Sequence, residues 1–413
     1  MLRIEGRIVN HDTEFDGAVE IDTRTGLIER IGPKEGRSDI DAGSCLIFPG
    51  FGDIHIHARE DAGGTQKYKE DFVSASVAAI HGGVVHVADM PNNPVAPVDD
   101  ASYATKEALT IASTVHVTLY AGIGPQTDPL RRHVPYKAFM GPSVGDLFFR
   151  TQAELESVIA KYRGKNVSFH CEDPEILEAN KDASTHELKR PASAEIAATE
   201  FALYLIEKHE LVGKLCHYST RDGLQKIVAA RARGVRVTCE VTPHHLFFDD
   251  SMMTDENRLW LQMNPPLRSA DDRRAMIAAL KNGDIDYVAT DHAPHTIAEK
   301  GEGVSGVPLL DTYGAFVTWL IVEQGFSATD IARVCAFNPG KFVREFLPVG
   351  FGRGYGRVEA GYVGSLTIID LNKPYLVTRE SIKSKCGWSP FEGHTFPGSV
   401  RYTVVRGEVC SAS

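Results

Sequence analysis

Short β-rich runs alternate with amphipathic helical stretches through the middle of the chain, from about Gly50 to Phe346. The helical stretches carry apolar residues at i, i+3 and i+4, which is the spacing of one helix face. Units of about 30–50 residues that alternate in this way favour a parallel sheet. About eight such units, with no GxGxxG motif after the first strand, predict a closed (β/α)8 barrel rather than an open doubly wound sheet.

Local signals place several helices and one loop within this region. The apolar spacing predicts helices over residues 68–83, 193–210, 221–234 and 271–283. Ser193 and Ser327 stand where a helix N-cap belongs, and Gly234 and Gly283 stand where a helix should end. The Gly-rich stretch from Glu299 to Pro308 is predicted to be a flexible loop, which either closes over a ligand or lies passively on the surface.

The two ends of the chain differ from the middle. Both contain short runs of alternating apolar residues, broken by Gly, Asp, Asn and Pro, which are typical of strands and turns. We therefore expect residues 1–49 and 347–413 to pair into one small β-sandwich domain. The catalytic barrel is predicted to span residues 50–346.

Composition excludes several classes of protein. The chain has 413 residues, is 43% hydrophobic and 24% charged, and carries a formal charge of −11, which argues against nucleic acid or an anionic membrane as a partner. No charged-then-apolar leader is visible, and no apolar run approaches the ~18 residues of a membrane span. The seven cysteines are dispersed and odd in number, so we expect free thiols and a cytoplasmic location.

Six residues that end apolar runs form a candidate ligand set for two metal ions: His55, His57, Lys137, His170, His217 and Asp291. His55 and His57 are one residue apart on a strand-like segment, so both imidazoles leave the same face and can bind one divalent ion. His170 and His217 each follow an apolar run, and each is also compatible with a structural role. Asp291 can bind a metal and accept a proton from a water held there.

Lys137 needs a separate argument. A lysine that ends an apolar run is either an exposed strand-end residue or a desolvated amine. If burial and nearby cations lower its pKa, the neutral amine can capture CO₂. The resulting carbamate is anionic and has two oxygen atoms, so it can bridge two metals.

Several motifs resemble those of one family when they are taken together. PGFGDIHIHARE, MPNNP, HCED, EVTPHHL, NPPLR and ATDHAPH, followed by NPGKF and PFEGHTFPGSV, are similar to the dihydroorotases of the amidohydrolase superfamily over essentially the whole chain. The resemblance implies a TIM barrel with a small β-domain from both termini, and one or two zinc ions. It also implies reversible conversion of N-carbamoyl-L-aspartate to L-dihydroorotate in de novo pyrimidine biosynthesis.

The resemblance also assigns roles to the ligand set. By position, His55, His57 and Asp291 would hold one metal, and His170 and His217 the other. Lys137 would be the carbamylated bridge of those members that use lysine, whereas other members use an aspartate in a different local sequence. Asp291 would be the general acid and base.

Four further residues match substrate contacts of the family. Arg59, Asn92 and His295 would hold the substrate carboxylate, and Asn264 would contact the pyrimidine ring. Arg59 is also compatible with a rim salt bridge, and Asn92 and Asn264 with turn caps beside prolines. A cationic carboxylate site favours dihydroorotate over allantoin or dihydrouracil.

Alternative functions and partners remain at this point. The chain is also compatible with an allantoinase or a dihydropyrimidinase, and less so with a non-catalytic dihydroorotase-like partner of aspartate transcarbamoylase. A homodimer and an association with aspartate transcarbamoylase are possible assemblies. Cys216 and Glu240 either form an accessory metal site with His55 or pack in the barrel wall, while His244 and His245 are expected to be structural or to orient a ligand.

Overall fold

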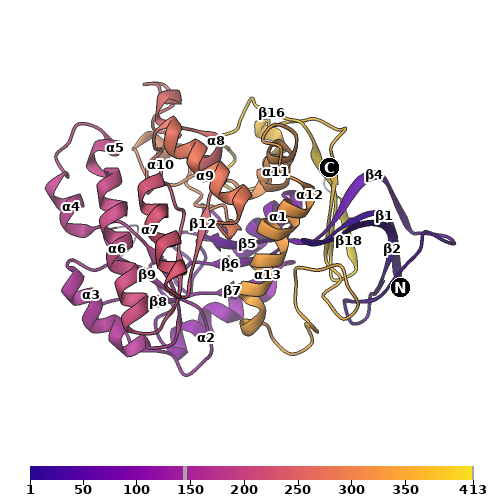
Figure 1. The fold of residues 1–413 in the computed structure, drawn as a ribbon, viewed down its shortest axis with the longest axis horizontal. Helices are drawn as coiled ribbons and strands as arrows, with labels where there is room; N and C mark the ends of the chain where they lie inside the picture. The colour runs from indigo at the N-terminus through magenta and orange to yellow at the C-terminus, as the bar shows by residue number, and fades with distance from the viewer. Residues whose placement is uncertain (143–146, 412–413) are drawn as a thin grey trace.

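The computed structural model describes residues 1–142 and 147–411. Residues 143–146 of the predicted barrel and residues 412–413 of the predicted C-terminal segment lie outside the described residues. Figure 1 shows a barrel surrounded by helices beside a β-domain that contains both chain ends. The predicted fold class is therefore confirmed, while the boundaries between the parts remain a prediction.

Parallel strands form the barrel wall. In chain order they are β5 (Phe51–Ile56), β6 (Val84–Asp89), β7 (His116–Leu119), β8 (Ala121–Ile123), β9 (Tyr136–Phe139), β10 (Asn166–His170), β11 (Val212–Leu215), β12 (Val237–Val241) and β13 (Tyr287–Val288). One sheet joins β5, β6 and β7, and another runs from β8 to β13. Only Tyr120 separates β7 from β8, so these two strands occupy one position of eight in the described barrel. A parallel bridge between Ile56 and His292 closes the ring.

Helices cover the outside of the barrel (Figure 1). The longer ones are α1 (Phe72–His81), α2 (Asp100–Leu109), α3 (Gln152–Ile159), α6 (Ala192–Lys208), α7 (Arg221–Ala232), α9 (Ala270–Asn282) and α11 (Tyr313–Val322). The shorter ones are α4 (Pro174–Ala179), α5 (His186–Lys189), α8 (Pro243–Phe247), α10 (Ile297–Gly301), α12 (Ala328–Ile331) and α13 (Asn338–Val343). A π-helical turn over Ala332–Phe337 joins α12 to α13.

The helix-end predictions were largely confirmed. Ser327 caps α12 in a reciprocal capping box with Asp330, and Gly283 ends α9 in the left-handed conformation with φ of 89°. The N-cap prediction at Ser193 was wrong, because α6 begins at Ala192 after Pro191. Proline has the φ that a helix start requires, so the chain turns into the helix two residues earlier.

The prediction of a flexible loop from Glu299 to Pro308 was only partly confirmed. Its first residues belong to helix α10, whose N-cap Thr296 forms a capping box with Glu299. The remaining residues are fixed by Lys300, whose buried ammonium donates to the main-chain carbonyls of Gln262, Val304 and Gly306 at 2.9, 2.9 and 3.0 Å. Three acceptors on one cation hold this turn against the barrel rim.

Both ends of the chain form one β-sheet. Its strands in spatial order are β18 (Glu408–Ser411), β17 (Ser399–Val405), β14 (Leu366–Asp370), β4 (Ile40–Pro49), β1 (Leu2–Val9), β2 (Glu14–Asp22) and β3 (Leu27–Gly32). β4 pairs with β1 in parallel and with β14 antiparallel, so N-terminal and C-terminal strands meet at the centre. Ile28 from β3 and Val404 from β17 share one apolar core, so the sheet folds over itself as a sandwich does.

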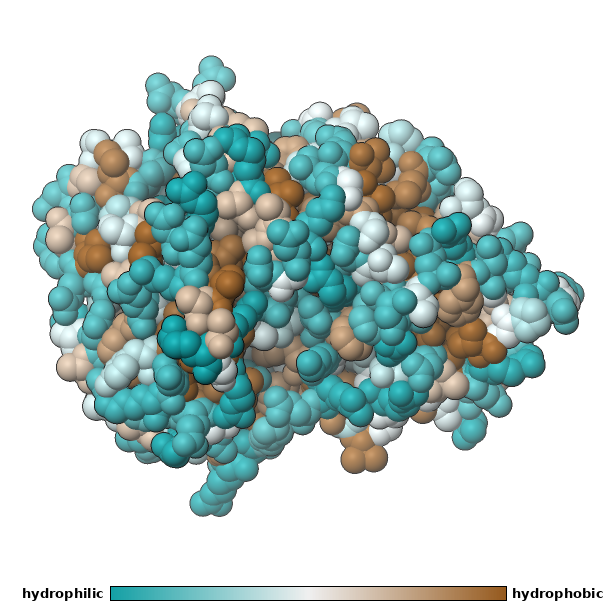
Figure 2. Space-filling model, in the orientation of Figure 1, coloured by the Kyte–Doolittle hydropathy of each residue, from teal (hydrophilic) through white to brown (hydrophobic). Residues whose placement is uncertain are grey.

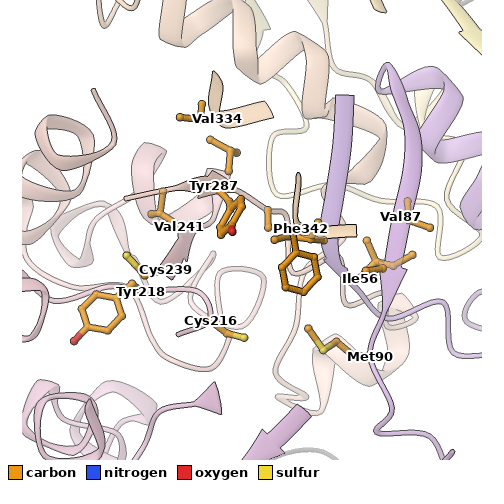
Figure 3. Packing of buried hydrophobic residues seen from close by; sticks show 14 of the residues in the cluster. Ile56, Val87, Met90, Cys216, Tyr218, Cys239, Val241, Tyr287, Val334 and Phe342 are labelled. Atoms are coloured by element: carbon orange, nitrogen blue, oxygen red, sulfur yellow. The ribbon is translucent and has the colours of Figure 1, made fainter. Parts of the chain in front are cut away.

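The barrel interior and its helical coat share one continuous apolar core. Figure 3 shows Ile56 and Val87 from adjacent strands, with Phe342 of α13 packed near them. On the face seen in Figure 2, hydrophilic residues predominate and apolar residues are scattered. The seven cysteines are free, and six of them are buried. Among the described residues, no helix combines the length and apolar character that a membrane crossing requires.

Candidate metal centre

The six predicted ligands line one pocket at the carboxyl ends of the barrel strands, together with Arg59, Asn92 and Asn264. His55 and His170 lie in the last two residues of β5 and β10, and Lys137 is the second of the four residues of β9. His57, His217 and Asp291 follow β5, β11 and β13 within three residues. Parallel strands deliver their C-terminal ends to the same rim of a barrel, which explains why residues so distant in sequence converge.

Two histidines and a carboxylate form the first donor group. The Nε2 atoms of His55 and His57 lie 3.1 and 2.9 Å from the same oxygen, Oδ1 of Asp291. Burial raises the pKa of Asp291, but the two histidines outweigh that effect and hold the pKa well below its usual value. The carboxylate is therefore ionised, and the group offers the nitrogen and oxygen donors that Zn²⁺ prefers.

His170 and His217 form the second donor group. Nδ1 of His170 lies 2.8 Å from Nε2 of His217, and both rings are buried. Burial lowers the pKa of both imidazoles, which keeps them neutral, the form that binds a metal. Behind them, Nε2 of His170 faces Glu172 at 2.8 Å, and Arg190 pairs with that carboxylate. This outer pair orients His170, and sequence reasoning did not predict it.

Lys137 lies between the two groups and is fully buried. Burial and Lys137 oppose the rise of the His55 pKa, which Glu240 and Asp291 nevertheless raise well above its usual value. In the other group, burial lowers the pKa of His170 and His217, and Lys137 adds to that effect. Its Nζ donates to the Cys216 sulfur at 2.9 Å. The alternative of an exposed strand-end lysine was therefore wrong.

A third cluster lies beneath the first donor group. Ligand atoms of His55, Cys216 and Glu240 lie within 4.8 Å of one another. Lys214 pairs with Glu240, and Lys137 donates to Cys216, so two lysine side chains already contact these donors. Cys216 also belongs to the buried core drawn in Figure 3. These contacts favour packing of Cys216 and Glu240 in the barrel wall over binding of an accessory metal. The ligand atoms of His55, Cys216 and Glu240 nevertheless remain close to one another.

Backbone strain is concentrated at the pocket. Arg59, His217 and Asp291 have φ values of 61°, 36° and 49°, in the left-handed region that side chains with a Cβ rarely adopt. Within the described residues only Glu210 and Arg406 share this feature among non-glycine positions. Strained conformations persist where the surrounding structure fixes them, and they cluster at functional sites.

The four predicted substrate contacts do not lie equally close to the pocket. Arg59, Asn92 and Asn264 line it, and Oδ1 of Asn92 lies 2.7 Å from Nδ1 of His57, which orients that ring. His295 is buried behind Arg59, with its Nε2 3.1 Å from Arg59 Nη2. Burial lowers the pKa of Arg59 to about 10, so its guanidinium remains charged at neutral pH.

Four other residues line the pocket, and the sequence prediction named none of them individually: Phe139, Ala293, Ser305 and Gly306. Ser305 and Gly306 fall in the stretch from Glu299 to Pro308, for which closure over a ligand was one of the two predicted alternatives. Ser305 and Gly306 come from the turn that Lys300 holds, so this stretch does contribute to the pocket. The Gly-rich composition was the signal for it. Phe139 and Ala293 are apolar residues with nothing in their local sequence to separate them from core residues. His244 and His245 are buried beside the site and are not pocket-lining residues.

Comparison with known proteins identifies the class. A model of the amidohydrolase family matches residues 46–410, which is most of the chain. The chain therefore belongs to the amidohydrolase family. Two dihydroorotases are similar over nearly full length. The dihydroorotase of Pyrococcus furiosus is 32% identical, and the match covers 98% of this chain and 91% of that protein. The dihydroorotase of Thermococcus kodakarensis is 34% identical, and the match covers 99% of this chain and 94% of that protein. These relatives place the chain among the dihydroorotases of the family.

A solved structure supports the fold independently. The L-hydantoinase (dihydropyrimidinase) from Arthrobacter aurescens matches with a TM-score of 0.88 and covers 99% of this chain and 96% of that chain. At 24% sequence identity this likeness shows the fold alone.

Proposed function

We propose that this chain is a zinc-dependent dihydroorotase that interconverts N-carbamoyl-L-aspartate and L-dihydroorotate in de novo pyrimidine biosynthesis. The observation that carries the proposal is the position of Arg59 in the same pocket as both donor groups. A metal-binding cyclic amidase acts on a ring amide, and a buried guanidinium in its pocket suits a ring that bears a carboxylate. The named relatives support the same substrate.

The donor groups fit two zinc ions. His55, His57 and Asp291 would hold one ion, His170 and His217 the other, and a carbamate formed from CO₂ on Lys137 would bridge them. Nitrogen and carboxylate oxygen are zinc ligands, and burial holds His170 and His217 neutral, as metal binding requires. Bound ions would lower the pKa of a water molecule towards neutrality and polarise the amide carbonyl.

Asp291 supplies the proton transfers. Its carboxylate lies in the pocket, is ionised and is only 12% exposed, so few solvent molecules compete with the reacting groups for its oxygen atoms. In ring opening, Asp291 accepts a proton from the attacking water and delivers it to the ring nitrogen as the C–N bond breaks. In ring closure the protonated carboxyl group assists loss of water, and the same atoms act in reverse.

The substrate is held by the remaining predicted residues. Arg59, Asn92 and His295 bind the substrate carboxylate, and Asn264 contacts the ring. Asn92 accepts from His57 through its oxygen, which leaves its amide N–H groups for the substrate. Oδ1 of Asn264 is buried without a hydrogen-bond partner among the described residues, as a group that awaits a ligand would be.

The cellular setting is also part of the proposal. Seven free thiols suit a reducing cytoplasm. A homodimer, or a complex with aspartate transcarbamoylase, would be the assembly. Sedimentation of the purified chain, alone and with a transcarbamoylase, tests both.

Turnover assays test the function. The zinc-loaded protein is assayed on dihydroorotate, allantoin and dihydrouracil at the same concentrations. We expect turnover of dihydroorotate to exceed that of the two neutral rings. Faster turnover of allantoin or dihydrouracil would instead indicate an allantoinase or a dihydropyrimidinase. No turnover, with less than one zinc per chain after mild purification, would indicate the non-catalytic relative.

A further inference from the structure

Arg59 is a buried cation without an ion-pair partner. It is 3% exposed, and in the part of the chain that the structure describes no carboxylate forms an ion pair with its guanidinium. Its Nε donates to the Pro294 carbonyl at 3.3 Å, and its Nη2 lies 3.1 Å from Nε2 of His295. A buried charge is costly unless an opposite charge compensates for it. The guanidinium is therefore suited to pair with an anion that enters the pocket.

Three carboxylates act on the charge of Arg59, and each pairs with another side chain. Burial lowers the pKa of Arg59, and the three carboxylates oppose that shift: Asp291, Asp89 and Glu299. Asp291 contacts the two histidines of the first donor group, at 3.1 and 2.9 Å. Oε1 of Glu299 lies 2.7 Å from Nζ of Lys69. The third carboxylate, Asp89, also has a lysine partner.

Asp89, the last residue of β6, is hydrogen-bonded to the backbone next to Arg59. Its Oδ1 accepts from the main-chain N–H of Ala58 at 2.7 Å. Its Oδ2 lies 2.6 Å from Nζ of Lys106, and both side chains are buried. Because Ala58 directly precedes Arg59, the hydrogen bond holds a negative charge close to the base of the Arg59 side chain.

Lys106 reaches this carboxylate from outside the barrel wall. It lies in α2, one of the covering helices, and is 2% exposed. Its ammonium also donates to Oδ1 of Asn93 and to the Met90 carbonyl, the latter at 3.3 Å. These two acceptors are neutral, so Asp89 supplies the opposite charge. A long side chain loses conformational entropy when it is buried, and compensation of Asp89 explains why this lysine is buried.

We propose that Lys106 is a positioning residue that neutralises Asp89 and so keeps Arg59 free for the carboxylate of the substrate. Without Lys106, Asp89 would be a buried carboxylate with no cation of its own, and it would draw Arg59 towards it. The substrate would then compete with Asp89 for one guanidinium. The inference rests on the proposed function for the identity of the substrate. It predicts that Lys106, which does not line the pocket, determines selectivity for a ring that carries a carboxylate over a neutral ring.

Two variants separate the charge of Lys106 from its packing. Lys106→Met keeps the apolar stem but leaves Asp89 unpaired. KM for dihydroorotate should rise about 10- to 100-fold, the effect of a weakened charge-assisted contact, while kcat, zinc content and the rate on dihydrouracil stay the same. In the double variant, Asp89→Asn with Lys106→Met, neither charge remains and the amide oxygen can still accept from Ala58. Its KM should be within about threefold of the wild-type value, because replacing both members of a buried pair by neutral groups of similar shape costs little.

The double variant decides the inference even where Lys106→Met does not fold. A double variant that fails to fold by circular dichroism, or that folds with a raised KM, would show that Lys106 acts through packing and would overturn the inference. A folded Lys106→Met protein with wild-type KM would overturn it as well. Lys161→Met is the matched control, because Lys161 pairs with Asp128 at 2.9 Å, is half exposed and lies outside the pocket. A wild type inactive on dihydroorotate would instead contradict the proposed function.

Discussion

The amine nitrogen of Lys137 lies 2.9 Å from the sulfur of Cys216, and neither side chain reaches solvent. Burial and Glu240 raise the pKa of Cys216, but Lys137 and Lys214 outweigh them and lower it. Lys137 thus lies at the meeting point of the two donor groups, in contact with a polarisable acceptor. A carbamate on this nitrogen would retain one N–H for the sulfur while its oxygens face the pocket.

Carbamylation of Lys137 is therefore the first prediction. Intact mass spectrometry of protein prepared with zinc and bicarbonate should show the mass of one added CO₂, which Lys137→Arg abolishes. Lys137→Ala should lower kcat by at least about 100-fold and weaken zinc binding, because the bridging ligand is lost. A small carboxylic acid in the assay should restore part of the activity. Full zinc content and wild-type turnover in Lys137→Ala would refute the bridge.

Asp291→Asn keeps the size of the side chain and removes its base. We expect kcat to fall by about 10²- to 10⁴-fold in both directions, because positioned proton transfer contributes that much. Zinc must be quantified in the same sample, since Asp291 is also a proposed ligand. If Asp291→Asn with full zinc occupancy retains substantial activity, another residue transfers the proton.

Arg59→Lys preserves charge but loses the planar pair of donors. KM for dihydroorotate should rise about 10- to 100-fold, while the rate on neutral dihydrouracil should stay the same. The neutral ring serves as the internal control for damage to the metal centre. Equal losses on both substrates would show that Arg59 supports the site generally rather than the carboxylate.

Glu195 should make stability depend on pH. Burial is the main reason that its pKa rises from 4.5 to about 7, although Ser219 and Arg268 oppose the shift. A raised pKa means that its stabilising contribution is complete below about pH 4.5 and is lost as pH rises to about 7. The wild type should therefore lose on the order of 3 kcal/mol relative to Glu195→Gln across this window, measured by urea unfolding at fixed zinc concentration. A constant difference between the two proteins would contradict the pKa shift.

The sequence predicts the pocket well where strand ends determine it. His55, His170 and Asp291 stand at the ends of apolar runs, and parallel strands bring such ends together whatever their separation along the chain. Side-chain partners on different elements were not predictable in this way. Glu299 is 230 positions from Lys69, and Lys214 is 26 from Glu240, so neither pair has a local signal. Glu172 follows His170 by two residues, and that spacing was the one available clue.

The central position of β4 in the seven-stranded sheet has a consequence for synthesis of the chain. One neighbour of β4, β1, is made first, while the other, β14, lies more than 300 residues later. During translation the edge of β4 is exposed until the whole barrel has emerged. Such long-range pairing is slow to form and open to aggregation, so we expect the β-domain to assemble last and the nascent chain to depend on chaperones.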